Sequence, residues 1–237
     1  MMKVGKRLKG LQTKVEPEKL YDVEEGFALL RELKSSKFDE TVEVALKLGV
    51  DPKQADQYIR GTVSLPAGTG KKVRVLVFAK GEKESEAKEA GADYIADDET
   101  LSKIQGGWFD FDLVIATPDM MGAVGRLGKV LGPKGLMPNP KSGTVTMDVG
   151  KAVTEFKAGR IEYRVNKFAD MNVPIGKISF SNENIVANFS AFVQAVLRAK
   201  PASLKGTYIQ SMVLSLTQSP GVPLDVAKAS LFVSKGS

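Results

Sequence analysis

Polar and apolar side chains alternate along residues 41–48, and the polar ones carry groups that could recognise RNA. Thr41, Glu43 and Lys47 bring a hydroxyl, a carboxylate and an ammonium, and the even-numbered positions are apolar. Successive side chains of a β-strand point to opposite faces, so these three polar groups share one face. A carboxylate can accept a hydrogen bond from a ribose 2′-hydroxyl or a base amine, which favours RNA over DNA as the partner.

The composition argues against covalent and metal-assisted chemistry. The 237 residues contain no His and no Cys, which removes the commonest general base and metal ligand as well as any thiolate. We therefore expect a protein that is not an enzyme and that holds neither a metal nor a cofactor. The net charge of +6 suits an anionic partner. Residues 160–237 hold 9 Lys and Arg against 4 Asp and Glu, whereas residues 69–159 hold 13 of each.

A nucleotide-dependent enzyme is the alternative, because Gly68–Lys71 resembles part of a phosphate-binding loop. The motif is incomplete, since Leu65 stands at its first glycine position and Lys72 where Ser or Thr is required. The segment also precedes an expected strand instead of following one. The glycines of residues 122–128 lie inside a helical pattern, whereas a dinucleotide fingerprint opens a helix. Stabilisation by ATP, GTP or NAD in a thermal shift assay would favour this alternative.

A second alternating stretch, Tyr208 to Thr217, predicts another strand with a polar face. Ser211, Ser215 and Thr217 supply short hydroxyls to that face, although ordinary strand alternation explains them equally well. Phe38 precedes the first strand, and an aromatic residue at that position is more often a core anchor than a surface contact. The candidate phosphate contacts are Arg164, Lys167 and Lys205.

The strands that would position these groups differ along the chain in their pattern of apolar residues. The two outer segments have the alternation of antiparallel strands, whereas the middle segment has near-continuous apolar strands between helices, typical of a parallel sheet. In the outer segments we expect a mobile arm over 1–20, helices at 22–34 and 183–199, and strands at 41–48, 60–65, 160–166, 178–180, 208–217 and 229–233. In the middle we expect strands at 73–78, 94–95, 113–116 and 144–146, and helices at 82–90, 98–105, from Thr117 onward and at 149–157.

These patterns predict an α/β protein of two domains. Neither outer segment can close a core alone, so we expect residues 1–68 and 159–237 to share one sheet. They would form a split α+β sandwich domain with a largely antiparallel sheet. Residues 69–158 would be an inserted three-layer α/β domain, Rossmann-like, with a parallel sheet. No apolar run approaches the roughly 20 residues of a bilayer span, so we expect no membrane partner.

Three stretches carry a resemblance to the ribosomal protein L1 family of the large subunit, in its bacterial form. They are residues 38–71, residues 128–141 with the run Gly-Pro-Lys-Gly-Leu-Met-Pro-Asn-Pro, and residues 206–221. The resemblance implies a cytoplasmic protein of the ribosome, monomeric when free, whose split domain binds rRNA at the base of a mobile stalk. It also implies a part in releasing exit-site tRNA, and repression of translation from its own operon mRNA.

The resemblance also implies which residues contact RNA. It places Phe38 at the RNA surface instead of in the core, and it puts Gln218 and Ser219 where the family has a Met-Gly pair that presses against RNA. Gln218 can donate hydrogen bonds but loses the apolar contact. A secondary RNA contact at Lys129, Lys134 and Lys141 is about as plausible as a rigid structural loop. The full set of expected RNA-binding residues is Lys37, Phe38, Glu40, Thr41, Glu43, Lys47, Arg164, Lys167, Lys205, Thr207, Ser211, Ser215, Thr217, Gln218, Ser219 and Gly221.

Overall fold

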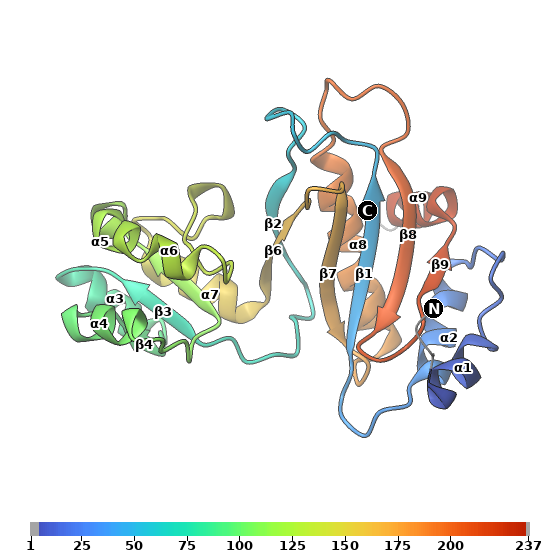
Figure 1. Ribbon diagram of the computed structural model, residues 1–237, viewed down its shortest axis with the longest axis horizontal. Helices are drawn as coiled ribbons and strands as arrows, with labels where there is room; N and C mark the ends of the chain where they lie inside the picture. The colour runs from blue at the N-terminus through green and yellow to red at the C-terminus, as the bar shows by residue number, and fades with distance from the viewer. Residues whose placement is uncertain (1–4, 236–237) are drawn as a thin grey trace. The chain divides into compact units, whose positions relative to one another are not determined.

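The computed structural model describes residues 5–235, which form two compact units (Figure 1). One unit combines the two ends of the chain, up to Gly70 and from Tyr163 onward, and the other is the inserted segment Lys71–Glu162. The junctions expected from the sequence, at 68/69 and 158/159, differ from the structural ones by a few residues.

A four-stranded antiparallel sheet joins the two ends of the chain. Its strand order is β7 (Asp170–Lys177), β1 (Thr41–Leu48), β8 (Ile209–Leu216) and β9 (Val222–Leu224). The central strand β1 comes from the N-terminal segment, and both of its neighbours come from the C-terminal segment. Neither segment could therefore form this sheet alone.

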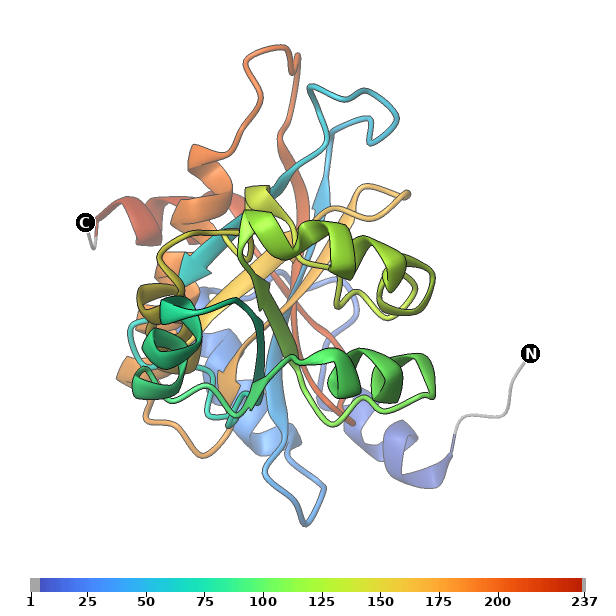
Figure 2. The same cartoon turned by 90° about the vertical axis from the view of Figure 1, so that its left-hand side faces the viewer.

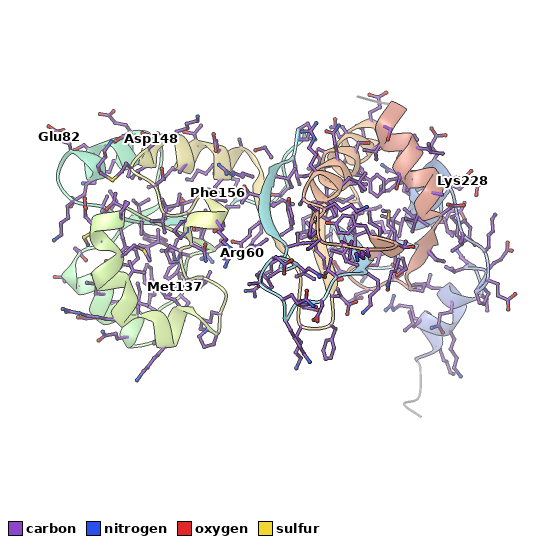
Figure 3. The ribbon with its side chains drawn as sticks, turned by 90° about the horizontal axis from the view of Figure 1, so that it is seen from above. Arg60, Glu82, Met137, Asp148, Phe156 and Lys228 are labelled. Carbon is purple, nitrogen blue, oxygen red and sulfur yellow. The ribbon has the colours of Figure 1, made fainter. Side chains whose placement is uncertain are left out.

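Three helices cover one face of this sheet. Helix α2 (Val23–Leu33) packs on β8 and β9, α8 (Asn182–Arg198) packs on β7, and α9 (Val226–Lys235) packs on β8 and α8. Phe27 and Phe189 meet edge to face in this layer, with ring centroids 5.6 Å apart. Figure 3 shows α8 and α9 together on one side of the sheet. The even-numbered apolar side chains of β1 point into this core and are buried, namely Val42, Val44, Leu46 and Leu48.

A separate two-stranded sheet carries the chain out of the split unit and back. It pairs β2 (Arg60–Ser64) with β6 (Arg160–Arg164). Gly61 is required at this crossing, because a Cβ there would lie 2.6 Å from the hydroxyl of Tyr163. That hydroxyl lies 3.4 Å from the Ala195 carbonyl, within reach of a hydrogen bond to α8.

The inserted unit is a three-layer α/β fold around a parallel sheet, as the sequence predicts. Strand β3 (Val75–Phe78) lies between β4 (Tyr94–Ile95) and β5 (Leu113–Ala116), and all four of its residues are buried. Figure 2 shows helices on both sides of these strands. Helices α3 (Glu82–Glu89) and α7 (Val149–Ala158) form one layer, and α4 (Asp98–Gln105), α5 (Met121–Arg126) and α6 (Gly128–Leu131) form the other.

Asp112 anchors the first strand of the inserted unit through two cations. Its carboxylate accepts hydrogen bonds from Lys71 Nζ at 2.6 Å and from Arg74 Nε at 3.1 Å. Burial alone would raise the pKa of this carboxyl, but the hydrogen bonds from Lys71 and Arg74 outweigh it and lower the pKa to about 2. The ionised form therefore stabilises the folded state above the ordinary pKa, and that contribution is lost as pH falls from about 4 to about 2.

Replacing Asp112 with asparagine should lower the free energy of unfolding by about 1–2 kcal/mol at pH 7, after allowance for solvent screening. The variant should also lose part of the acid dependence of stability between pH 4 and pH 2. Urea titrations at several pH values measure both effects. An equal change in stability at pH 7 and at pH 2 would contradict the assigned role of the carboxylate.

Three expectations for the outer segments are wrong. Residues 229–233 belong to helix α9 instead of a strand. Ala229 and Val233 are both buried and lie one helical turn apart. The Asp225 carboxylate accepts hydrogen bonds from two backbone amides in the first turn of α9. The strand expected at 178–180 lies earlier, as β7, where buried Met171 and Val173 alternate with exposed Asn172 and Pro174. Part of the supposedly mobile arm forms helix α1 (Lys6–Gln12).

Two expected elements of the inserted unit are less regular than the sequence predicts. Residues 144–146 make a single parallel bridge, between Val145 and Ala116. The helix after Thr117 begins as a 3₁₀ turn, η1 (Pro118–Met120), and the Thr117 side chain makes no capping hydrogen bond to it. Its hydroxyl instead lies 3.4 Å from the Phe78 carbonyl.

Candidate nucleic-acid interface

The face of the four-stranded sheet opposite its helices carries polar side chains in rows across the strands. We call this surface the open face and define it by Thr41, Glu43, Ala45 and Lys47 of β1 and the residues that pair with them on β7 and β8. Each of these four side chains is partly exposed. Glu43 pairs with Ser215, Lys47 pairs with Ser211, and Ala45 lies between them opposite Val213.

The hydroxyl groups of Thr41 and Thr217 are fixed at the start of β1. Thr217 Oγ1 accepts from the Thr41 amide at 3.1 Å, and Lys177 Nζ donates to Thr41 Oγ1 at 2.8 Å. Lys177 belongs to β7, pairs with Thr41 and brings a cation to the open face. Sequence reasoning missed it because the strand that holds it was expected at 178–180.

Lys47 is held in place at the other end of β1. Its Nζ lies 3.1 Å from the Asp170 carboxylate and 2.5 Å from the Phe168 carbonyl. Asp170 faces Lys47 from β7, so the ion pair spans two strands of the open face. The ammonium is therefore only partly available to an incoming phosphate, and its main effect in the free protein is to fix the loop before β7.

Glu40 does not lie on the open face, contrary to the expectation. Its even position continues the buried side of β1, and the residue is 0% exposed. Its Oε1 accepts from the Gln218 amide at 3.2 Å, while its carbonyl accepts from Ile178 at 3.0 Å. Glu40 therefore positions the loop that follows β8 instead of presenting a carboxylate to solvent.

Phe38 lies outside the core, with 48% of its surface exposed. The segment that carries it is anchored by Asp39, whose carboxylate accepts from the Ser179 amide at 3.1 Å and from its hydroxyl at 2.7 Å. The exposed Lys37 stands beside it. The ring is thus held by a fixed segment at the start of β1, where a nucleic-acid base could stack on it.

The loop of residues 217–221 lies at the same end of the sheet as Phe38 (Figure 1). Ser219 Oγ accepts from the Leu216 amide at 2.9 Å and lies 2.8 Å from the Pro220 carbonyl, so this hydroxyl shapes the loop. Gly221 approaches β8 so closely that a Cβ would lie 2.7 Å from Val213. The Gln218 side chain is exposed.

Helix α1 contributes a contact to this end of the open face that sequence reasoning missed. Arg7 Nη1 donates to the Gln218 carbonyl at 2.9 Å and to Ser35 Oγ at 2.5 Å. The guanidinium thereby links the segment before Phe38 to the loop after β8. No local pattern could have indicated this, because Arg7 and Gln218 are 211 positions apart.

The remaining expected contacts of the split unit lie toward the opposite end of the sheet. Two loops, residues 165–169 and 199–208, flank this end (Figure 1). They carry exposed side chains of the expected set, which are Lys167, Lys205 and Thr207, and Arg164 is exposed just before the first loop. Together with Lys37 at the Phe38 end, these cations place positive charge at both ends of a polar surface.

Comparison with known protein families gives a match to the ribosomal protein L1p/L10e family over residues 30–220. The matched range includes the whole inserted unit and β1, β7 and β8 of the split unit. The chain belongs to the ribosomal protein L1p/L10e family. It is therefore an RNA-binding protein of the large ribosomal subunit, bound to rRNA in the cytoplasmic ribosome. Members of this family are structural ribosomal proteins and not enzymes.

The three lysines expected to make a secondary RNA contact lie in the inserted unit of this L1p/L10e chain. Lys129, Lys134 and Lys141 are all exposed, and Lys134 Nζ lies 4.1 Å from the centroid of the Phe109 ring. The loop between them is fixed by internal contacts, since the Asn139 amide donates to Thr144 Oγ1 at 2.8 Å. It is thus an ordered loop, and all three lysines are exposed to solvent.

The described residues offer neither a candidate metal-binding cluster nor a candidate membrane-spanning helix. Across residues 5–235, no cluster of three or more side chains with metal-binding groups is present. Over the same residues, none of the helices is both long enough and apolar enough to cross a lipid bilayer.

Proposed function

We propose that the open face binds the folded rRNA at the base of the mobile stalk of the large subunit. The observation that carries this proposal is the set of polar groups that neighbouring strands bring to the open face, where Glu43 pairs with Ser215 and Lys47 lies between Asp170 and Ser211. Phe38 and the exposed cations flank these groups, as expected for a surface that meets both bases and phosphates.

The part of the open face around Glu43 and Ser215 suits ribose better than phosphate. Glu43 is a hydrogen-bond acceptor, and the Ser215 and Thr217 hydroxyls both donate and accept. A 2′-hydroxyl both donates and accepts, so it can donate to the Glu43 carboxylate and accept from a serine or threonine hydroxyl. The cations at the ends of the sheet would then contact the backbone phosphates on either side. This division of roles would make the surface selective for RNA.

Titration with the stalk rRNA fragment tests this proposal. Counterions should leave the RNA when its phosphates bind Lys37, Arg164, Lys167 and Lys205. The logarithm of the binding constant should therefore fall with the logarithm of salt concentration, with a slope of about −3 to −4. A DNA copy of the fragment should bind much more weakly, because it lacks the 2′-hydroxyls. Equal affinity for the fragment and for random duplex DNA would contradict the proposal.

We further propose that the inserted unit takes part in the release of exit-site tRNA. Its exposed lysines at 129 and 141 support this role, since they provide cations on a unit separate from the open face. Replacing both with glutamine should slow tRNA release by ribosomes while leaving the affinity for the rRNA fragment unchanged. An unaltered release rate would contradict this role for the two lysines.

The free protein is proposed to repress translation of its own operon mRNA through the same open face. An mRNA leader that folds like the stalk rRNA would meet the same ribose and phosphate contacts. A reporter carrying this leader should lose translation when the protein is in excess and recover it with the Phe38→Ala variant. Repression that persists with that variant would place the mRNA on another surface.

A further inference from the structure

A second exposed aromatic ring lies at the end of β1 opposite Phe38. Phe168 is 63% exposed, more than Phe38 at 48%. It belongs to the loop between β6 and β7, which Figure 1 shows at the other end of the four-stranded sheet from the Phe38 segment. The eight residues of β1 span about 25 Å at the usual rise of a strand. The two rings are therefore too far apart to contact the same nucleotide.

The loop that carries Phe168 is ordered by its own hydrogen bonds. Asn166 Oδ1 accepts from the amides of Phe168 at 2.8 Å and Asp170 at 3.0 Å, and the Ala169 amide donates to the Asn166 carbonyl at 3.1 Å. Ala169 has a φ of 62°, a left-handed conformation that is unfavourable for alanine. The loop thus holds its exposed phenylalanine in a defined place despite a strained neighbour.

Two contacts attach this loop to β1. The Leu48 amide donates to the Ala169 carbonyl at 2.9 Å, and Lys47 Nζ lies 2.5 Å from the Phe168 carbonyl. Lys47 is itself a residue of the open face, so the position of Phe168 is tied to that surface. A ligand lying along β1 toward its C-terminal end would meet this loop.

The surroundings of the ring indicate the kind of partner. Lys167 Nζ lies 5.0 Å from the centroid of the Phe168 ring, and Asn166 and Asp170 are the other near neighbours in the chain. A protein or membrane contact would call for a contiguous apolar patch, whereas this ring stands among polar and charged groups. A nucleobase stacks on a single aromatic face, and an adjacent cation can contact its phosphate.

We propose that Phe168 is a second stacking platform, which takes an unpaired base of the rRNA bound along the open face. This inference rests on the proposed function of the open face. Phe38 and Phe168 then engage two separate unpaired nucleotides, one at each end of β1. Their spacing would select an RNA fold that presents two unpaired bases about one strand length apart.

Affinity for the stalk rRNA fragment tests this inference through three variants. Phe168→Ala should weaken binding roughly 5- to 150-fold, the range expected for one stacked base. Phe168→Tyr should stay within about threefold of the unaltered protein, because tyrosine keeps the aromatic face. Leu231→Ala is the matched control: this leucine is 61% exposed but lies on α9, across the sheet from the open face, and its loss should leave affinity unchanged.

Salt dependence separates stacking from charge. Phe168→Ala should leave the slope of log affinity against log salt unaltered, whereas Lys167→Ala should reduce its magnitude by about 1. Full affinity in Phe168→Ala, with an unchanged Tm, would overturn the stacking role, and so would a loss in Phe168→Tyr as large as that in Phe168→Ala. If the unaltered protein failed to prefer the fragment over duplex DNA, the function proposed for the open face would fail instead.

Discussion

Replacing Asn188 with leucine should lower the free energy of unfolding by about 3–5 kcal/mol, the largest effect expected from a single substitution in the split unit. Asn188 is 0% exposed on α8 and bonds to three backbone groups. Its Oδ1 accepts from the Ala67 amide at 2.9 Å, and its Nδ2 donates to the carbonyls of Gly68 at 2.8 Å and Ile175 at 2.7 Å. Leucine would fill the space but remove the hydrogen-bond partner of all three groups, of which the Ile175 carbonyl is buried and the other two are partly buried.

Chemical denaturation compared with Asn184→Leu measures this effect. Asn184 lies on the same helix with an exposed side chain, so its substitution should change stability by less than about 0.5 kcal/mol. A similar small change at both positions would mean that other groups or water satisfy the backbone of residues 67 and 68. The substitution at Asn188 should also loosen the turn through which the chain leaves the split unit.

Replacing Phe38 with alanine should weaken binding of the stalk rRNA fragment by about 1–3 kcal/mol. Because nearly half of this side chain is exposed and its segment is anchored through Asp39, the folded state should lose little stability. The expected loss is thus one of affinity with an unchanged melting temperature. Filter binding and thermal denaturation of the same samples measure the two quantities.

Met147→Ala provides the matched control for Phe38→Ala. Met147 is an apolar side chain of similar exposure, 52%, but it belongs to the inserted unit. Its substitution should leave affinity for the fragment unaltered. If Phe38→Ala bound as tightly as the unaltered protein, Phe38 would be an exposed residue without a role in the interface.

The sequence predicted the alternating faces of β1 well because the signal is local. Side chains alternate strictly along β1, one face is buried and the other is not, and no residue of the strand breaks the pattern. The fold of the inserted unit was predicted equally well, because buried parallel strands appear in the sequence as short apolar runs between helices. Both predictions depend on neighbours in the chain and not on distant contacts.

The errors arose where a local pattern was ambiguous or interrupted. The apolar run at 229–233 fits a strand or a helix, and only the packing of α9 against β8 and α8 decides between them. Pro174 obscured β7, although a proline is tolerated there because β7 is an edge strand of its sheet. With β7 misplaced, Lys177 and Asp170 could not be assigned to the open face.

The sequence could not reveal the contacts that position the candidate site. Glu40 reads as one more polar residue of the strand, yet it is buried against the loop after β8. Asn188 lies in an amphipathic helix and bonds to a turn more than 100 residues away. Gly70 follows this turn, and a Cβ there would lie 2.8 Å from the Lys177 side chain, so Gly70 packs against β7 and does not belong to an open phosphate-binding loop.

The most direct test of the open face as the RNA surface uses the absence of cysteine from the chain. A single cysteine at Ala45, in the middle of the open face, should react with a maleimide in the free protein and be protected when the stalk rRNA fragment is bound. A cysteine at Leu231 on the opposite side should react equally in both states. Loss of reactivity at Leu231 with continued reactivity at Ala45 would place the RNA on the other side of the sheet and contradict the account.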